Sequence, residues 1–98
     1  MSYINFEWDP DKAEKNLLKH GVTFEEAQTA FYDVHARLIP DPDSSFGEER
    51  FLLLGQSTDY KTLMVCHCYR DPDEQVRIIS ARKADKNERK QYEVFRYA

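Results

Sequence analysis

Three strand-like segments joined by two short polar turns constrain the fold of this chain more than any other feature. The segments are Arg50–Ser57, Thr62–Arg70 and Gln75–Arg82, and the turns are Thr58–Lys61 and Asp71–Glu74. The turns contain the Asp, Thr and Pro residues that are typical of chain reversals. A connection of four residues joins antiparallel neighbours, because a parallel crossover needs a dozen residues or more. The sequence therefore predicts an antiparallel sheet.

Helical patterns lie on both sides of these strands. The pair Asp9-Pro10 is typical of a helix start, and Gly21 is typical of a helix end. The stretch Thr23-Phe24-Glu25-Glu26 is a capping box that begins a second helix. A third helix is predicted to start at Asp85 and to continue to about Arg96.

The order of these elements predicts the α+β class. A chain of 98 residues suits one domain, so we expect a single domain over residues 1–98. It would hold a small antiparallel sheet of three to four strands, two N-terminal helices and one C-terminal helix. The apolar stretch Ala36–Ile39 is the candidate for the fourth strand, and Tyr3–Glu7 is a possible further one.

Charge is distributed unevenly along the chain. The net charge of the whole chain is −4. Residues 1–76 carry seven Lys or Arg and fifteen Asp or Glu, whereas residues 77–98 carry seven basic and three acidic side chains. A net charge of +4 at the C-terminal end of an acidic protein creates a local positive field that attracts phosphate. A solvated basic helix is the alternative interpretation.

Several classes of protein are disfavoured by the sequence. The longest apolar runs have four residues, far fewer than the roughly 20 of a membrane span, and the N-terminus has no secretion signal. Cys66 and Cys68 are one residue apart on a predicted strand, which argues against a disulfide. They have no second ligand pair for zinc, and no phosphate-binding glycine loop is present. We therefore expect a cytoplasmic protein without a metal or other cofactor.

Strand alternation sorts the polar side chains of the predicted sheet onto two faces. The sorting assumes that Arg70 pairs with Gln75 and that Ser57 pairs with Thr62. A change of one residue in either loop would move a whole strand's side chains to the other face. One predicted face carries Arg50, His67, Tyr69, Ser80 and Arg82, and the other carries Cys68, Arg70 and Arg77.

A histidine, a hydroxyl and arginines on one small sheet suit phosphodiester chemistry. RNA cleavage through the ribose 2′-OH needs a base, an acid and a cation for the charge that develops on the phosphate, and it needs no metal. Imidazole is the usual proton-transfer group near neutral pH, and guanidinium binds phosphate through its planar fork. His20, His35 and His67 are the candidates for the first role. A structural role for each of these histidines and arginines is the alternative.

Several conspicuous sequence blocks lie along most of the chain. The blocks are Phe6–Lys12, Asn16–Ala27, Glu48–Leu52 with Gly55, Arg77–Ala84, Glu88-Arg89 and Tyr92-Glu93. In this order, over about residues 6–93, they resemble the BrnT family of toxins.

This resemblance implies a toxin of the RelE-like superfamily, in which helices pack on a small antiparallel sheet. It implies a metal-independent endoribonuclease that acts on RNA. It also implies a ribbon-helix-helix antitoxin as partner and DNA binding only through the complex with that antitoxin. The catalytic candidates are His67, Arg70, Arg77, Ser80 and Arg82. The RNA-binding candidates are Lys19, His20, Arg50, Lys83 and Lys86.

Two interpretations of function stay open at this point. The first is a ribonuclease toxin with His67 as the preferred acid or base. The second is a non-catalytic RNA- or partner-binding module, an inactive toxin that represses its operon together with its antitoxin. A solvent-facing His67 beside two guanidinium groups would favour the enzyme, whereas a His67 buried against Leu52 and Ile78 would favour the module.

Overall fold

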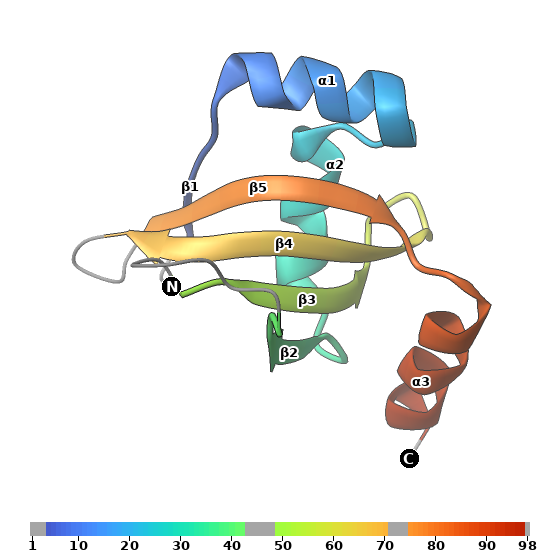
Figure 1. The fold of residues 1–98 in the computed structure, drawn as a ribbon. Helices are drawn as coiled ribbons and strands as arrows, with labels where there is room; N and C mark the ends of the chain where they lie inside the picture. Colours follow the sequence, from blue (N-terminus) through green and yellow to red (C-terminus); the bar gives the residue numbers. More distant parts are fainter. Residues whose placement is uncertain (1–3, 43–48, 71–74, 98) are drawn as a thin grey trace.

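A five-stranded sheet flanked by three α-helices forms the structure (Figure 1). The computed structural model describes residues 4–42, 49–70 and 75–97. In spatial order the strands are β1-β5-β4-β3-β2. In chain order the elements are β1 (Asn5–Glu7), α1 (Pro10–His20), α2 (Phe24–Thr29), the short 3₁₀ helix η1 (Ala30–Tyr32), β2 (Arg37–Pro40), β3 (Phe51–Gln56), β4 (Thr62–Arg70), β5 (Gln75–Lys83) and α3 (Lys86–Arg96).

The α+β class is confirmed, and the composition of the sheet is corrected. The predicted antiparallel sheet of three to four strands is a mixed sheet of five, because β1 pairs with β5 in parallel. The strands from β2 to β5 are antiparallel, as short connections require. Strand β1 has only three residues and pairs with a segment about 70 positions away. Local turn patterns cannot reveal such a distant pairing.

The register of the sheet differs from the predicted register at two places. Arg70 does pair with Gln75, as predicted. The predicted pairing of Ser57 with Thr62 is wrong, because Gln56 takes that position. Ser57 instead belongs to the turn, where its backbone N–H donates to the carbonyl of Lys61 at 2.8 Å.

A β-bulge is the second difference. Cys66 pairs with Ser80, but His67 pairs with Ile78, so that Ile79 is an extra residue in β5. The predicted sorting of side chains between faces is therefore wrong for Ser80 and Arg82, whereas the separation of His67 and Tyr69 from Cys68, Arg70 and Arg77 is confirmed. Arg77, Ser80 and Arg82 share one face with Cys66, Cys68 and Arg70, and His67 and Tyr69 lie on the opposite face.

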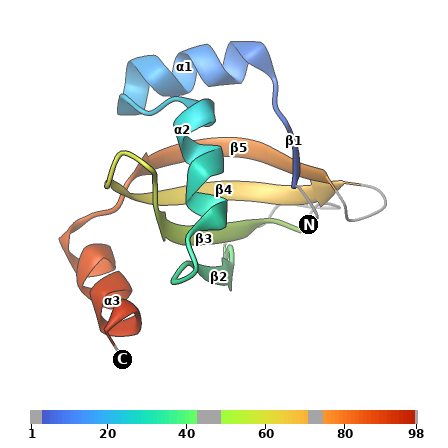
Figure 2. The same ribbon diagram turned by 180° about the vertical axis from the view of Figure 1, so that it is seen from behind.

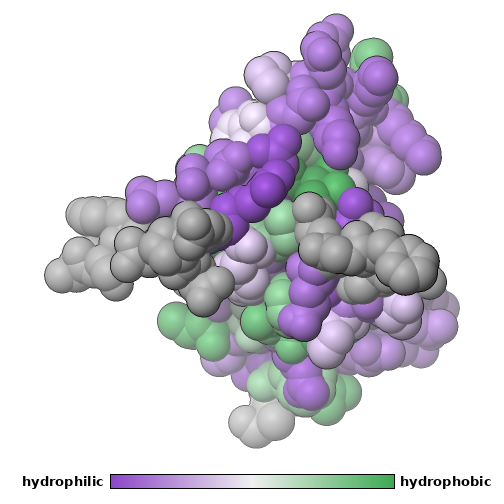
Figure 3. Space-filling view, turned by 60° about the vertical axis from the view of Figure 1, so that its left-hand side comes forward, coloured by the Kyte–Doolittle hydropathy of each residue, from purple (hydrophilic) through white to green (hydrophobic). Residues whose placement is uncertain are grey.

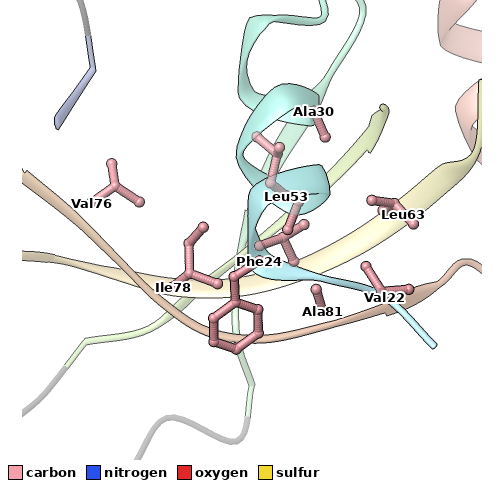
Figure 4. Packing of buried hydrophobic residues seen from close by; sticks show 10 residues of the cluster. Val22, Phe24, Ala30, Leu53, Leu63, Val76, Ile78 and Ala81 are labelled. Atoms are coloured by element: carbon pink, nitrogen blue, oxygen red, sulfur yellow. The ribbon is translucent and has the colours of Figure 1, made fainter. Parts of the chain in front are cut away.

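The hydrophobic core lies between the sheet and the two N-terminal helices. Figure 2, the view from behind, shows α2 lying across the strands of the sheet. The close view shows Phe24 near labelled side chains of β3, β4 and β5 (Figure 4). Phe24, Leu63 and Ile78 are almost fully buried there. A second, smaller cluster joins Leu54 and Met64 of the sheet to Ala84 and to Tyr92 of α3.

The predicted helix signals are confirmed by the caps. The Asp9 carboxylate accepts from the N–H of Asp11, and Gly21 ends α1 in the left-handed conformation at φ 70°. The hydroxyl of Thr23 accepts from the N–H of Glu26 at 3.0 Å. Asp85 and Glu88 form a complete capping box at α3. Among the described residues, none of the helices has the length and apolar character that a membrane crossing requires.

Candidate functional site

A basic groove lies between α1 and the bulged part of β5. Its volume is about 200 Å³. Three lysines of α1 line it at helical spacing, together with Asn16 and His20 of the same helix and Ile79 and Ser80 of β5. The lysines are Lys12, Lys15 and Lys19. Figure 3 shows that hydrophilic residues predominate in the upper part of the molecule, where α1 lies.

The buried Asn16 side chain holds the two walls of the groove together. Its amide nitrogen donates to the carbonyls of Val22 and Ala81 at 2.9 and 2.8 Å. Its carbonyl oxygen accepts from the N–H of Ala81 at 3.0 Å. Asn16 is only 6% exposed, so these bonds replace those that water would make. The lysines on either side of Asn16 are thereby held next to Ser80.

The electrostatic character of the groove is positive. The three lysines are exposed, and His20 is partly buried at the C-terminal end of α1. No Asp or Glu is among the described residues that line the groove. Ammonium groups, an imidazole and a hydroxyl without a competing carboxylate suit an anionic ligand such as a phosphate.

Two of the predicted catalytic arginines are engaged by carboxylates. Arg77 of β5 donates to Glu7 of β1 at 2.5 Å. The Arg82 guanidinium donates two hydrogen bonds to the Glu88 carboxylate in a bidentate arrangement, at 2.7 and 2.9 Å. The hydrogen bond to Glu88 raises the pKa of Arg82, and the bond from Arg82 lowers the pKa of Glu88. Glu88 also accepts a hydrogen bond from the N–H of Asp85 at the start of α3. The contact between Arg82 and Glu88 therefore links β5 to the first turn of α3.

The other predicted cations are spread over the molecule. Arg70 is exposed at the end of β4, and Lys86 is exposed in the first turn of α3. Lys83 lines a different groove, beside the turn between β3 and β4. Arg50 is partly buried just before β3. The structure therefore brings Lys19, His20 and Ser80 together, and it places the remaining candidates elsewhere.

His67 lies inside the protein, which is the buried one of the two positions considered from the sequence. The side chain is 0% exposed and packs edge-on against Phe31, with ring centroids 4.8 Å apart. Its Nδ1 is 3.1 Å from the carbonyl oxygen of Val65, and its Nε2 is 3.3 Å from the hydroxyl of Tyr69. Burial lowers the pKa of His67 and outweighs the opposing effect of the Val65 carbonyl. His67 thus favours the neutral form.

This burial predicts a loss of stability in mild acid. Below about pH 6.5 the unfolded chain binds a proton at His67 that the folded state resists. The free energy of unfolding should therefore fall as the pH drops from 7.5 to 5.0. We expect His67→Phe to flatten that dependence and the exposed-site variant His35→Gln to keep it. Urea unfolding at both pH values measures the change, and equal dependence in all three proteins would contradict the prediction.

Cys66 of β4 lacks the character of a nucleophile. Burial, reinforced by the nearby Asp41, raises the pKa of the Cys66 thiol to about 11, against the opposing effects of Arg50 and Ser80. Cys66 is therefore protonated at neutral pH. The described part of the chain contains no group of three His, Cys, Asp or Glu side chains placed to hold a metal ion.

Lys12 and Lys15 were not predicted as RNA-binding residues, although both line the groove. Their spacing with Lys19 along one helix face is visible in the sequence and was the available signal. Asn16 gave no such signal, because its three partners lie on a loop and on a distant strand.

Comparison with known proteins shows the family of the chain and a similar fold. The sequence pattern described as "Ribonuclease toxin, BrnT, of type II toxin-antitoxin system" matches residues 8–88. The fold is similar to that in the 1.1 Å crystal structure of the Brucella abortus ribonuclease toxin BrnT, with a TM-score of 0.65 and 21% sequence identity. That similarity covers 86% of this chain and 100% of the Brucella chain. Comparison with curated protein sequences gave no match.

The class is that of toxins from type II toxin–antitoxin systems. Within this class, the chain belongs to the BrnT family of ribonuclease toxins. Membership implies an antitoxin as partner and RNA as target.

Proposed function

We propose that the protein is a metal-independent endoribonuclease and that the groove between α1 and β5 binds the scissile phosphate. The observation that carries this proposal is the convergence of three lysines, an imidazole and a hydroxyl in one groove. None of the described lining residues is acidic, so the phosphate meets no repulsion there. The family's ribonuclease description supports RNA as the substrate.

The groove supplies the groups that cleavage through the 2′-OH needs. In this proposal His20 takes the proton from the ribose 2′-OH, and the freed oxygen attacks the phosphorus. Lys15 and Lys19 stabilise the charge that develops on the phosphate, and Ser80 donates a hydrogen bond to it. Lys19 then gives a proton to the departing 5′ oxygen. The products are a 2′,3′-cyclic phosphate and a 5′-hydroxyl.

The remaining candidates take supporting roles in this proposal. Lys83, Lys86 and Arg50 contribute to the long-range attraction of RNA. Arg77 and Arg82 would contact phosphate only by exchanging their carboxylate partners. A catalytic role for them, for Arg70 or for His67 stays a prediction.

A non-catalytic binding module is the second candidate function. The buried position of His67 and the ion pair between Arg82 and Glu88 favour it, because the first removes a predicted catalytic group from solvent and the second occupies another with a carboxylate. In that case the protein would act as a co-repressor with its antitoxin. The presence or absence of cleavage by purified toxin separates the two candidates.

Cleavage is expected to persist in EDTA. Protein freed of antitoxin, incubated with single-stranded RNA, should give products with 2′,3′-cyclic phosphate ends at the same rate with and without the chelator. Mass spectrometry of the products measures the ends. Activity that disappears in EDTA and returns with a divalent ion would contradict metal independence, and intact RNA under all conditions would favour the binding module.

The resemblance also supports proposals about partner and location. We propose a ribbon-helix-helix antitoxin that covers the basic surface, DNA binding only through that complex, and a cytoplasmic site of action. An inhibitor that presents carboxylates to Lys12, Lys15 and Lys19 would associate rapidly at low salt. Co-purification of the two proteins, with exclusion of RNA by the complex, tests the arrangement.

A further inference from the structure

A second polar groove lies where the turn between β3 and β4 meets the start of α3. Its volume is about 390 Å³. Figure 1 shows this turn at the same end of the sheet as the connection from β5 to α3. Tyr60 and Lys61 line the groove from the turn, Lys83 from the end of β5, and Arg89 and Glu93 from α3. The mechanism proposed above uses no part of it except the general charge of Lys83.

Tyr60 is the unusual residue of this groove. It has a left-handed backbone, with φ 64°, although it is not a glycine. Its N–H donates to the carbonyl of Ser57 at 2.9 Å, and the Ser57 hydroxyl bonds to Glu26 of α2, so the turn is anchored to the core side. The tyrosine side chain is nevertheless 84% exposed. A non-glycine residue in this conformation is uncommon, and strained backbone positions of this kind cluster at ligand-binding sites.

Three basic side chains line the same groove as this ring. Lys61, Lys83 and Arg89 line the groove, and Glu93 is the one carboxylate among its described lining residues. Lys61 also pairs with Glu26 of α2 at 3.9 Å, so Lys83 and Arg89 are the cations of the groove that the proposal uses. Arg89 donates to the carbonyl of Ala84 at 3.0 Å, which fixes its guanidinium at the groove. An exposed aromatic ring beside cations is the arrangement by which proteins hold unpaired nucleotides, with the base on the ring and the backbone on the charges.

The two grooves are joined by one strand. Ser80 lines the first groove and Lys83 the second, and their backbones are three residues, roughly 10 Å, apart along β5. Their side chains lie on opposite faces of the strand, so an RNA strand whose phosphate lies at Ser80 would reach Lys83 within a few nucleotides only by passing around β5. Single-stranded sites of about 4 to 16 nucleotides are usual for such surfaces.

We propose that the second groove binds an unpaired nucleotide flanking the cleavage site, with its base stacked on Tyr60 and its phosphate held by Lys83 and Arg89. The proposal rests on the proposed function, since it takes RNA to lie in the first groove. It assigns to the turn between β3 and β4 a role in choosing single-stranded over paired RNA, because a paired base has no free face for Tyr60.

The test measures affinity for a single-stranded ten-nucleotide RNA whose 2′ positions are methylated, so that it cannot be cut. Fluorescence anisotropy gives the dissociation constant for wild type, Tyr60→Ala and Tyr60→Phe. We expect Tyr60→Ala to weaken binding about tenfold, as loss of one stacked base does, and Tyr60→Phe to stay within about twofold because the ring remains. The control is Tyr97→Ala, at an equally exposed tyrosine (78%) outside the groove, and it should leave the affinity unchanged. If Tyr60→Ala folds poorly, Tyr60→Gly replaces it, because glycine accepts the left-handed backbone.

Each other outcome identifies which proposal fails. Unchanged RNA affinity in Tyr60→Ala together with weaker RNA binding in Lys15→Ala would contradict nucleotide binding in the second groove. It would still support phosphate binding in the first groove. Unchanged affinity in both variants would overturn the proposed function as well. Weaker antitoxin binding by Tyr60→Ala, with RNA affinity unchanged, would make this groove a protein-docking surface and would also overturn the inference.

Discussion

Replacement of His20 by alanine is expected to reduce the rate of RNA cleavage by about 10²- to 10⁴-fold, which is the usual contribution of general acid–base catalysis. His20 is the imidazole that lines the groove with Lys15, Lys19 and Ser80. Single-turnover cleavage of a short RNA measures the effect. Thermal unfolding should change little, because His20 is only partly buried and makes no core contact of the kind His67 makes.

The matched control for this experiment is His35→Ala. His35 is an exposed histidine just before β2, outside the groove, and its replacement should leave cleavage unchanged. Full activity in His20→Ala, with activity lost in a stable His67→Phe protein, would assign proton transfer to His67 instead.

The largest effect on stability is expected at Asn16. Asn16→Leu keeps the approximate size of the side chain but removes three buried hydrogen bonds, to the carbonyls of Val22 and Ala81 and from the N–H of Ala81. Those backbone groups would then be buried without these partners, so we expect a loss of about 3 kcal/mol in the free energy of unfolding. For a domain of this size that loss lowers Tm by roughly 15 °C.

Denaturant unfolding of Asn16→Leu beside Asn87→Leu provides the comparison. Asn87 is exposed on α3, so the same substitution there should change stability by no more than about 0.5 kcal/mol. Equal stability of the two variants would show that Asn16 does not hold α1 to β5.

Local signals in the sequence predicted the local structure well. The caps at Asp9, Thr23 and Asp85 are side chains that accept hydrogen bonds from backbone N–H groups within three residues. Both the donor and the acceptor of each cap therefore lie in one short stretch of sequence. The antiparallel pairing of β3, β4 and β5 follows from connection length in the same way. These interactions are specified by neighbours in the chain.

The errors arose where a distant contact decides the outcome. Ser57 leaves the strand because Glu26 of α2 accepts its hydroxyl at 2.9 Å, which shifts the β3 register by one residue. The bulge at Ile79 occurs where Asn16 of α1 bonds to both backbone groups of Ala81, two residues further along β5. Each shift of one position moved side chains to the face opposite the predicted one, in β3 and in the part of β5 that follows Ile79.

The candidate site was predicted in part for the same reason. Lys19, His20 and Ser80 were selected and do lie in one groove. The partners of Arg77 and Arg82 were not foreseen, although Glu88 is close to Arg82 in the sequence. Glu7 is 70 positions from Arg77, and only the parallel pairing of β1 with β5 brings them together.

The extra residue in β5 has a consequence for how this family can vary in length. Ile79 has no partner in β4, so residues before and after it follow the same strand with opposite parity. Deletion of this one position would turn either Val76 and Ile78 out of the core or Ser80 and Arg82 into it. We therefore expect relatives to tolerate insertions and deletions in the connections between strands, and to keep β5 at constant length.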